Sequence, residues 1–106
     1  MAYRAQKEIT PQEVAEQLSR GKDLIMLDVR ESAEWVEGHV EGAIHIPLGE
    51  LMQRYHELDS AEEIIMMCRS GNRSGLACEL LSEKGYMAVN MKGGLSKWTD
   101  INKLVR

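Results

Sequence analysis

Two short runs of almost purely apolar residues, 24–29 and 64–67, constrain the fold of this chain most strongly. Only Asp28 interrupts the first run, close to its end. A strand with one face in water alternates apolar and polar residues, whereas an unbroken apolar run is typical of a strand buried on both faces. Strands of this kind belong to parallel sheets, because crossover helices cover both faces of such sheets. The two runs therefore predict a mainly parallel sheet.

A helix with clear start and stop signals precedes the first run. Thr10 has the position of an N-cap, Pro11 that of the first helical residue, and Glu13 that of the capping-box carboxylate. Arg20 and Gly21 then supply a cation and a C′ glycine. The sequence therefore predicts a helix of about three turns between these signals.

The rest of the chain repeats the order of strand and helix. A short strand over 43–46 is followed by apolar residues at helical spacing over 48–58. The run 64–67 is likewise followed by an apolar helical face over 76–81, and residues 86–89 form a last strand. Strands that alternate with helices predict an α/β fold with a mainly parallel sheet and right-handed crossovers.

Composition limits the classes of protein to which the chain can belong. Its 106 residues include 13 Lys and Arg against 17 Asp and Glu, a formal net charge of −4, and 43% are hydrophobic. This apolar fraction supports a single soluble domain over residues 1–106, and no apolar run approaches the roughly 20 residues that span a bilayer. The basic residues near the N-terminus have no hydrophobic stretch behind them, so we expect no secretory signal and a cytoplasmic location. The acidic balance argues against nucleic-acid binding, so any anion site must be local.

Three segments with polar or reactive residues fall at the ends of the predicted strands, namely 28–31, 68–74 and 90–94. The carboxyl ends of parallel strands meet at one edge of the sheet, and ligands of such sheets bind there. We therefore expect the functional site at this edge.

Of the three segments, 68–74 has the most distinctive chemistry. Cys68 ends a buried strand and the last residues of the segment begin a helix, so the N–H groups of the loop can converge at the positive end of that helix. Such surroundings lower the pKa of a thiol and favour its nucleophilic thiolate, and Arg69 and Arg73 add positive charge. The stretch 64–78 contains no carboxylate. The segment therefore predicts a nucleophilic cysteine in an anion-binding loop.

Several motifs of the chain resemble those of the rhodanese family of sulfurtransferases. The loop from Cys68 to Arg73 is similar to the C-x-x-G-x-R active-site loop of that family, with Gly71 in the glycine position. One departure is His45, where the family commonly has asparagine. The other signatures of the family resemble three further segments: residues 28–31, residues 38–47, and Gly93 and Gly94 with Trp98.

The resemblance implies a fold, a reaction and its partners. The fold is expected to be a five-stranded parallel sheet flanked by helices on both faces, with Ile9 in a short first strand. Cys68 is expected to attack the outer sulfur of a donor such as thiosulfate, to release sulfite and to hold the sulfur as a persulfide. Cyanide, a small thiol, thioredoxin or another protein would then accept the sulfur. The resemblance implies no metal and no organic cofactor.

Each candidate site residue has an expected role. Cys68 is the nucleophile, Arg69 steers anionic donors, and Arg73 clamps the loop. Asp28 is expected to hold loop backbone, and Arg30 to contact the substrate or the loop. The remaining residues of the loop surround the transferred sulfur or its donor: Ser70, Gly71, Asn72 and Ser74.

The second cysteine and the histidines do not indicate another site. Cys78 lies one turn beyond Ser74 in the following helix, where a small packing residue is more common than a resolving thiol. Two cysteines allow at most one disulfide, and in a reducing compartment both are expected to be thiols. The histidines have no metal-ligand spacing with either cysteine, so we expect no zinc site: His39, His45 and His56.

Other functions fit parts of the same pattern. Tyrosine-phosphatase-like enzymes and arsenate reductases also place a cysteine and an arginine in a loop at a helix N-terminus. Phosphatase loops have five residues between the two, whereas Cys68 and Arg73 are separated by four, and a shorter ring suits a sulfur atom better than a tetrahedral oxyanion. A partner-binding module without activity is disfavoured, because many such modules lack the cysteine. A persulfide carrier in a sulfur relay keeps the chemistry of Cys68, and the sequence leaves it open, together with the donor, the acceptor and the oligomeric state.

Overall fold

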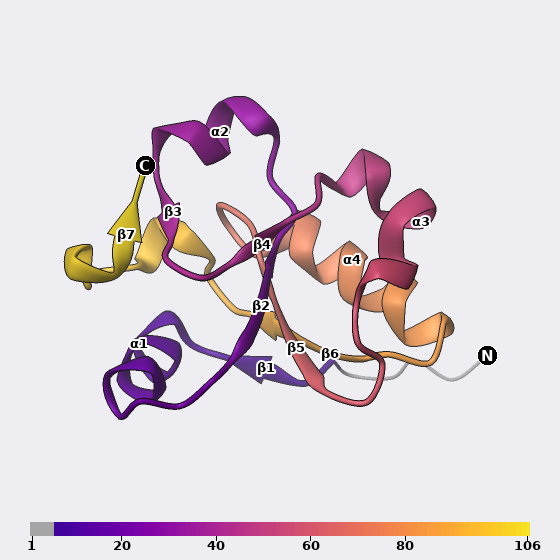
Figure 1. The fold of residues 1–106 in the computed structure, drawn as a ribbon, viewed down its shortest axis with the longest axis horizontal. Helices are drawn as coiled ribbons and strands as arrows, with labels where there is room; N and C mark the ends of the chain where they lie inside the picture. Colours follow the sequence, from indigo (N-terminus) through magenta and orange to yellow (C-terminus); the bar gives the residue numbers. More distant parts are fainter. Residues whose placement is uncertain (1–5) are drawn as a thin grey trace.

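The computed structural model of the chain describes residues 6–106. The residues before these, which bear on the expectation about a secretory signal, lie outside the described part. The main sheet has five parallel strands in the order β1-β6-β5-β2-β4 (Figure 1). They are β1 (Glu8–Ile9), β2 (Ile25–Asp28), β4 (Ile44–His45), β5 (Glu63–Met67) and β6 (Met87–Met91). This confirms the predicted parallel sheet, including the short first strand at Ile9.

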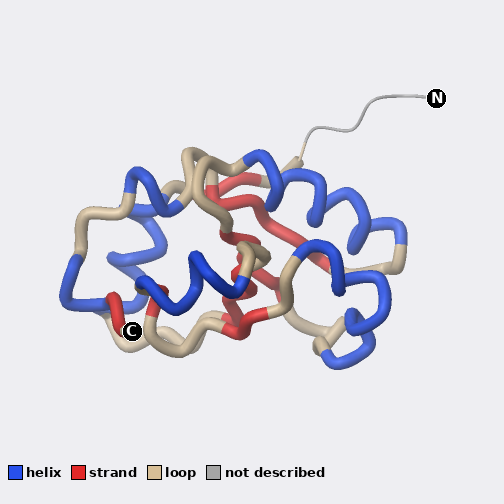
Figure 2. Tube along the Cα trace, turned by 90° about the horizontal axis from the view of Figure 1, so that it is seen from above, coloured by secondary structure: helices blue, strands red, loops and turns tan. Residues whose placement is uncertain are grey.

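Helices lie on both sides of the central strands (Figure 2), which confirms the predicted α/β architecture. One face is covered by α3 (Leu51–Arg54) and α4 (Asn72–Glu83). Alternate side chains of the central strands, such as Leu27 and Ile64, pack there against Leu81 of α4, and all three are fully buried. The alternation follows from the period of two along a strand.

The opposite face is covered by α1 (Pro11–Ser19). The intervening side chains of the central strands, Met26 and Ile65, belong to a second apolar cluster with Val14 of α1. Because both faces of β2 and β5 are covered, their sequences contain the almost purely apolar runs from which the sheet is predicted.

The predicted start of α1 is confirmed in detail. The Thr10 hydroxyl accepts a hydrogen bond from the Glu13 backbone N–H at 3.1 Å, and the Glu13 carboxylate accepts one from the Thr10 backbone N–H at 2.9 Å. Gly21 follows the helix with a φ of +78°, a left-handed conformation that glycine adopts without steric cost.

The segment 48–58 differs from the expected continuous helix. It consists of a 3₁₀ turn over Leu48–Glu50, α3, and a second 3₁₀ turn over Tyr55–Glu57. Gly49 lies in the first turn and is a poor helix former, which favours the tighter and shorter form.

Three short elements have no counterpart in the sequence analysis. They are α2 (Ser32–Glu37), β3 (His39–Val40) and β7 (Leu104–Val105), and they gather at one end of the molecule (Figure 1). β3 and β7 pair with each other in an antiparallel ladder. Two-residue strands are too short for a periodic signal, and α2 buries none of its residues, so it has no apolar face to recognise.

Candidate active site

Cys68 directly follows β5, the central strand of the sheet. It continues the alternation that buries Ile64 and Met66 and belongs to the same apolar cluster beneath α4. Gly71 then turns the chain with a φ of +97°, and α4 begins at Asn72. A left-handed turn between a strand and a helix brings the N–H groups of the loop back over the cysteine.

Three polar groups surround the Cys68 Sγ. The Gly71 N–H lies 3.1 Å from it, the Ser74 N–H 3.3 Å and the Ser74 Oγ 3.3 Å. Burial raises the pKa of the Cys68 thiol, but hydrogen bonds from the Ser74 hydroxyl and from the N–H groups of Ser74, Gly71 and Ser70 outweigh it, so the pKa is lower than that of an ordinary thiol. The loop therefore favours the thiolate form of Cys68.

Ser74 and Asn90 form a buried layer behind the sulfur. The Ser74 hydroxyl donates to the Asn90 Oδ1 at 2.6 Å, and the Asn90 Nδ2 donates to the Gly71 carbonyl at 3.2 Å. Ser74 is fully buried and Asn90 is 6% exposed. The sequence predicts that segment 90–94 lies at this edge of the sheet, but it does not single out Asn90, because only the pairing of β5 with β6 brings Asn90 beside the loop.

Arg73 forms an ion pair with Glu34 of α2. Its two terminal nitrogens contact the two carboxylate oxygens at 2.6 and 2.9 Å, a bidentate arrangement. The hydrogen bond from Arg73 lowers the pKa of Glu34 to about 2, against the burial that raises it, and the pKa of Arg73 is raised in turn. Arg73 thus links the first turn of α4 to α2. Glu34 is absent from the sequence analysis, although the lack of any carboxylate in 64–78 implies that a partner for Arg73 must come from elsewhere.

The outer residues of the loop point into solvent. Arg69, Ser70 and Asn72 are exposed, and their side chains form no hydrogen bond or ion pair with any described residue. Arg69 is therefore an unpaired cation beside Cys68 within residues 6–106.

Asp28 and Arg30 lie at the end of β2 and bind each other. The Asp28 carboxylate accepts hydrogen bonds from the Arg30 backbone N–H at 3.0 Å and from its Nη2 at 2.8 Å, and the same Nη2 also donates to the Gly38 carbonyl. Asp28 therefore holds the backbone of the turn that directly follows β2. Neither side chain hydrogen-bonds the segment 68–74, and Arg30, which is 8% exposed, contributes to the walls of a groove beside the loop.

The segment after β6 fastens the start of the loop. Leu95 and Ser96 donate backbone N–H groups to the carbonyls of Cys68 and Arg69, both at 2.9 Å. Gly94 has a φ of +66°, and a Cβ at this position would lie 2.7 Å from the Cys68 carbonyl oxygen and closer still to that of Arg69. Only glycine fits here without displacing the loop.

A groove of about 360 Å³ opens next to the loop. Its walls come from the α2 end of the molecule, the start of the loop, the segment after β6 and β7. The lining residues are Arg30, Glu34, Glu37, Gly38, Arg69, Leu95, Ser96, Trp98 and Leu104.

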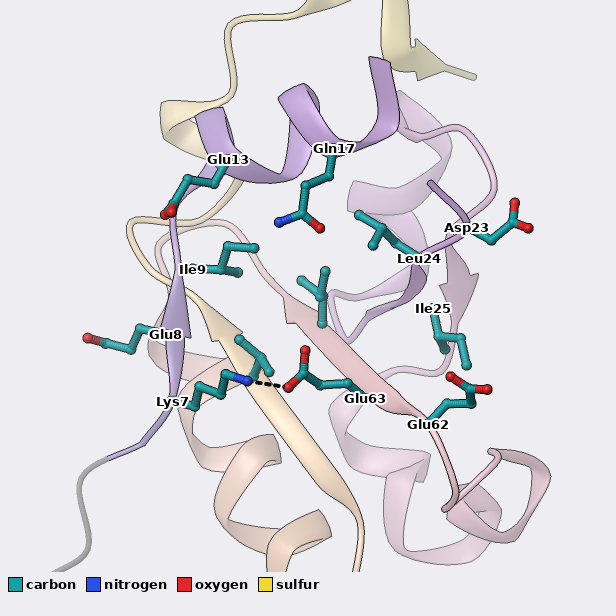
Figure 3. A pocket seen from close by; sticks show the side chains of 12 residues that line it. Lys7, Glu8, Ile9, Glu13, Gln17, Asp23, Leu24, Ile25, Glu62 and Glu63 are labelled. Atoms are coloured by element: carbon teal, nitrogen blue, oxygen red, sulfur yellow. Dashed lines mark hydrogen bonds and ion pairs between the residues drawn. The ribbon is translucent and has the colours of Figure 1, made fainter. Parts of the chain in front are cut away.

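A second cavity, of about 330 Å³, lies beneath α1 at the starts of β2 and β5 (Figure 3). Among the described residues, Lys7 is the only basic one in its lining, and it forms an ion pair with Glu63. The lining also includes four further carboxylates: Glu8, Glu13, Asp23 and Glu62. Their charge opposes the binding of an anion, so the two cavities differ in chemistry as well as in position.

Among residues 6–106, no three His, Cys, Asp or Glu side chains lie together as metal ligands would. In the same part of the chain, no helix combines the length and the apolar character needed to cross a membrane.

Comparison with known proteins shows the family of the chain. A family model for the rhodanese-like domain matches residues 10–101. The chain belongs to this family. The match spans all the motif segments of the sequence analysis, so the resemblance stated there is confirmed.

Named relatives of this rhodanese-like protein include sulfurtransferases and a sulfur carrier. A Bacillus subtilis protein named "Putative sulfurtransferase YtwF" is 37% identical over 92 residues, which cover 87% of this chain and 89% of the relative. "Putative sulfur carrier protein YrkF" of the same organism is 37% identical over 93 residues, 87% of this chain but only 50% of the relative. "Thiosulfate sulfurtransferase PspE" of Escherichia coli is 41% identical over 71 residues, 65% of this chain and 68% of the relative.

A solved structure has the same fold. The crystal structure of a rhodanese-like domain protein from Staphylococcus aureus superposes with a TM-score of 0.85 at 30% identity and covers 90% of this chain and 93% of its own.

The departure from the rhodanese-like pattern at His45 also has a structural account. The His45 Nε2 donates to the Arg30 carbonyl at 2.8 Å, and its ring stacks on Trp35 with 4.6 Å between the ring centroids. His39 stacks on Trp35 as well, at 3.5 Å. His45 thus holds the turn after β2 in place.

Proposed function

We propose that this rhodanese-like protein is a sulfurtransferase that takes a sulfane sulfur from thiosulfate and passes it to a thiol or to cyanide through a persulfide on Cys68. The observation that carries the proposal is the polar surroundings of the Cys68 Sγ: the N–H groups of Gly71 and Ser74 donate to it, and the Ser74 hydroxyl lies 3.3 Å away. Such donors stabilise negative charge on sulfur before and after transfer.

The first half-reaction forms the persulfide. The Cys68 thiolate attacks the outer sulfur of thiosulfate, a new S–S bond forms, and the S–S bond of thiosulfate breaks as sulfite leaves with its electron pair. The Cys68 side chain is fully buried, so the groups that cover it must move apart before the donor reaches the sulfur. Arg69 is exposed and unpaired among the described residues, and its charge favours the approach of an anionic donor.

The second half-reaction returns the thiolate. A nucleophilic acceptor attacks the terminal sulfur of the persulfide, and the bond to the Cys68 Sγ breaks with its electron pair left on Cys68. Cyanide leaves as thiocyanate in this step, and a small thiol or a thioredoxin-like protein leaves as its own persulfide. The groove of about 360 Å³ beside Arg69 gives such an acceptor a place to approach.

The test is a thiosulfate-to-cyanide transfer assay on the wild type, Cys68→Ala and Cys78→Ala. Cys78 is also buried in α4, and burial raises its pKa to about 12, so it stays a neutral thiol. It is therefore the matched control for Cys68. We expect Cys68→Ala to abolish transfer while it keeps its fold by circular dichroism, and Cys78→Ala to keep most of the activity. Retention of more than about a tenth of the wild-type rate in Cys68→Ala would refute the proposal.

A persulfide carrier in a sulfur relay is the second candidate, favoured by the relative named as a sulfur carrier. A carrier uses the same Cys68 chemistry but receives its sulfur from a protein persulfide. Loading of Cys68 by a cysteine desulfurase persulfide at a rate well above that with thiosulfate would favour the carrier over the free-standing enzyme.

A further inference from the structure

A chain of buried polar side chains leads from the Cys68 sulfur to β6. The Ser74 Oγ lies 3.3 Å from the Cys68 Sγ and 2.6 Å from the Asn90 Oδ1. All three residues are buried, so water does not compete for these contacts. The Asn90 side chain forms no hydrogen bond with the sulfur and has no role in the reaction steps described above.

The orientation of the Asn90 amide is fixed by a second contact. Its Nδ2 donates to the Gly71 carbonyl at 3.2 Å, and a carbonyl can only accept. The Oδ1 must therefore face Ser74, where it accepts the hydroxyl hydrogen.

A serine hydroxyl has a single hydrogen to donate. While that hydrogen points to Asn90, the Ser74 Oγ can only accept from Cys68, which suits the S–H of a neutral thiol. A thiolate has no hydrogen and accepts only, so it needs the Ser74 hydrogen for itself. Rotation about the Cβ–Oγ bond of Ser74 is enough to move the hydrogen from one acceptor to the other, because both lie within reach.

We propose that Asn90 is a positioning residue that holds the Ser74 hydrogen away from Cys68 while Cys68 is a neutral thiol and releases it to the sulfur when Cys68 ionises. The importance of this exchange for turnover rests on the proposed function. The exchange itself concerns only the ionisation of Cys68, which can be measured without any sulfur donor.

The charged side chains near Cys68 take no part in this movement of the Ser74 hydrogen. On α4 and α2, Arg73 is paired with Glu34, and at the end of β2 Asp28 is paired with Arg30. Arg69 of the loop is exposed and has no ion-pair partner among the described residues. Cys78 on α4 has a pKa raised to about 12 by burial and by the charge of Cys68, so it stays neutral. None of these side chains hydrogen-bonds Ser74 or Asn90, so a change at Asn90 leaves them in place.

The experiment is a double-mutant cycle on the pH dependence of iodoacetamide alkylation at Cys68, followed by mass spectrometry of the Cys68 peptide. The variants are Asn90→Ala, Ser74→Ala and the double variant, each checked for its fold by circular dichroism. Asn90→Leu serves as a second variant that removes the amide but fills more of its space. Asn102→Ala, an exposed asparagine outside the loop, is the control.

The effect of Asn90→Ala on the alkylation midpoint is compared in two backgrounds, the otherwise unmodified protein and Ser74→Ala. We expect the midpoint to fall by about 0.5 pH units more in the otherwise unmodified protein, which is about a threefold change in thiolate population. Asn90→Ala also removes the hydrogen bond to the Gly71 carbonyl, and the shift in the Ser74→Ala background measures the effect of that loss. The difference between the shifts in the two backgrounds therefore isolates the effect of the Ser74 hydrogen. Equal shifts in the two backgrounds, or a difference of opposite sign, would overturn the proposal and leave Asn90 with a structural role only. If this coupling appears but thiosulfate transfers no sulfur, the proposed function fails and the exchange stands. If transfer occurs without coupling, only the exchange fails.

Discussion

Single residues decide how firmly the Cys68 loop is held. The sulfur receives its hydrogen bonds from within the loop, whereas the loop is fixed from outside by Glu34 of α2 through Arg73. A cation in the first turn of a helix opposes the helix dipole, and the Glu34 carboxylate removes that conflict. The pair is bidentate and only partly exposed, so we expect it to matter more than a surface ion pair.

We predict that Arg73→Lys is not a conservative change. An ammonium cannot contact both Glu34 oxygens in one plane, so the loop should loosen, with turnover lower by about tenfold and a higher alkylation midpoint for Cys68. Arg54→Lys is the matched control, because Arg54 also pairs with carboxylates, Glu50 and Glu57, but on the surface of α3. An unchanged midpoint in Arg73→Lys would contradict the role of Arg73 as a clamp.

The same ion pair predicts a dependence of stability on pH. The pKa of Glu34 is lowered from 4.5 to about 2 in the folded protein, so its ionised form favours folding. That contribution is complete above about pH 4.5 and is lost as the pH falls towards about 2. Urea unfolding should therefore show a gap in free energy between wild type and Glu34→Gln that is constant near neutral pH and narrows below pH 4.5. A gap that stays constant throughout the acid range would show that the charge of Glu34 does not stabilise the fold.

At the scale of elements, length and burial separate what the sequence predicts from what it misses. The strands β2 and β5 and the capped helix α1 are predicted because they bury a regular pattern of residues, whereas α2, β3 and β7 are short and have no such pattern. The residues of the site also fall into those that the sequence predicts and those that it misses. The loop after β5 is local in sequence and can be recognised, but Glu34 and Asn90 come from other elements and join it only through the fold.

The segment after β6 gives a prediction at this scale. Gly94→Ala should displace the start of the Cys68 loop, because its Cβ would overlap the Arg69 carbonyl, and we expect a loss of about 2 kcal/mol of stability together with most of the sulfur transfer. Gly21→Ala is the control, since Gly21 also has a positive φ but nothing within 4 Å of its added Cβ. We expect about 1 kcal/mol of destabilisation there and unchanged transfer. Equal effects on transfer in the two variants would show that the contact at Gly94 does not shape the loop.

The length of the loop gives another prediction. With four residues between Cys68 and Arg73, the ring of N–H groups should hold one sulfur atom and crowd the oxygens of a phosphate. We expect no detectable hydrolysis of p-nitrophenyl phosphate, and a one-residue insertion after Ser70 should reduce sulfur transfer. Phosphatase turnover comparable to sulfur transfer in the unmodified protein, and lost in Cys68→Ala, would reinstate the phosphatase hypothesis.

For the whole molecule, the order of strands explains where the chemistry gathers. β5 lies between β6 and β2, so residues at or next to the carboxyl ends of these three strands meet at one edge: Asn90, Cys68 and Asp28. The sequence is sufficient to predict this edge, because all parallel strands expose their carboxyl ends on the same side. Carboxylates gather around the cavity beneath α1 (Figure 3), whereas the stretch 64–78, which contains the loop, has none.

The central claim, that Cys68 carries the transferred sulfur, is tested most directly by mass spectrometry of the intact protein after incubation with thiosulfate. We predict a gain of one sulfur atom, about 32 Da, located on the Cys68 peptide, removed by cyanide and absent from Cys68→Ala. No gain of mass at Cys68, or a gain that persists in Cys68→Ala, would contradict the claim.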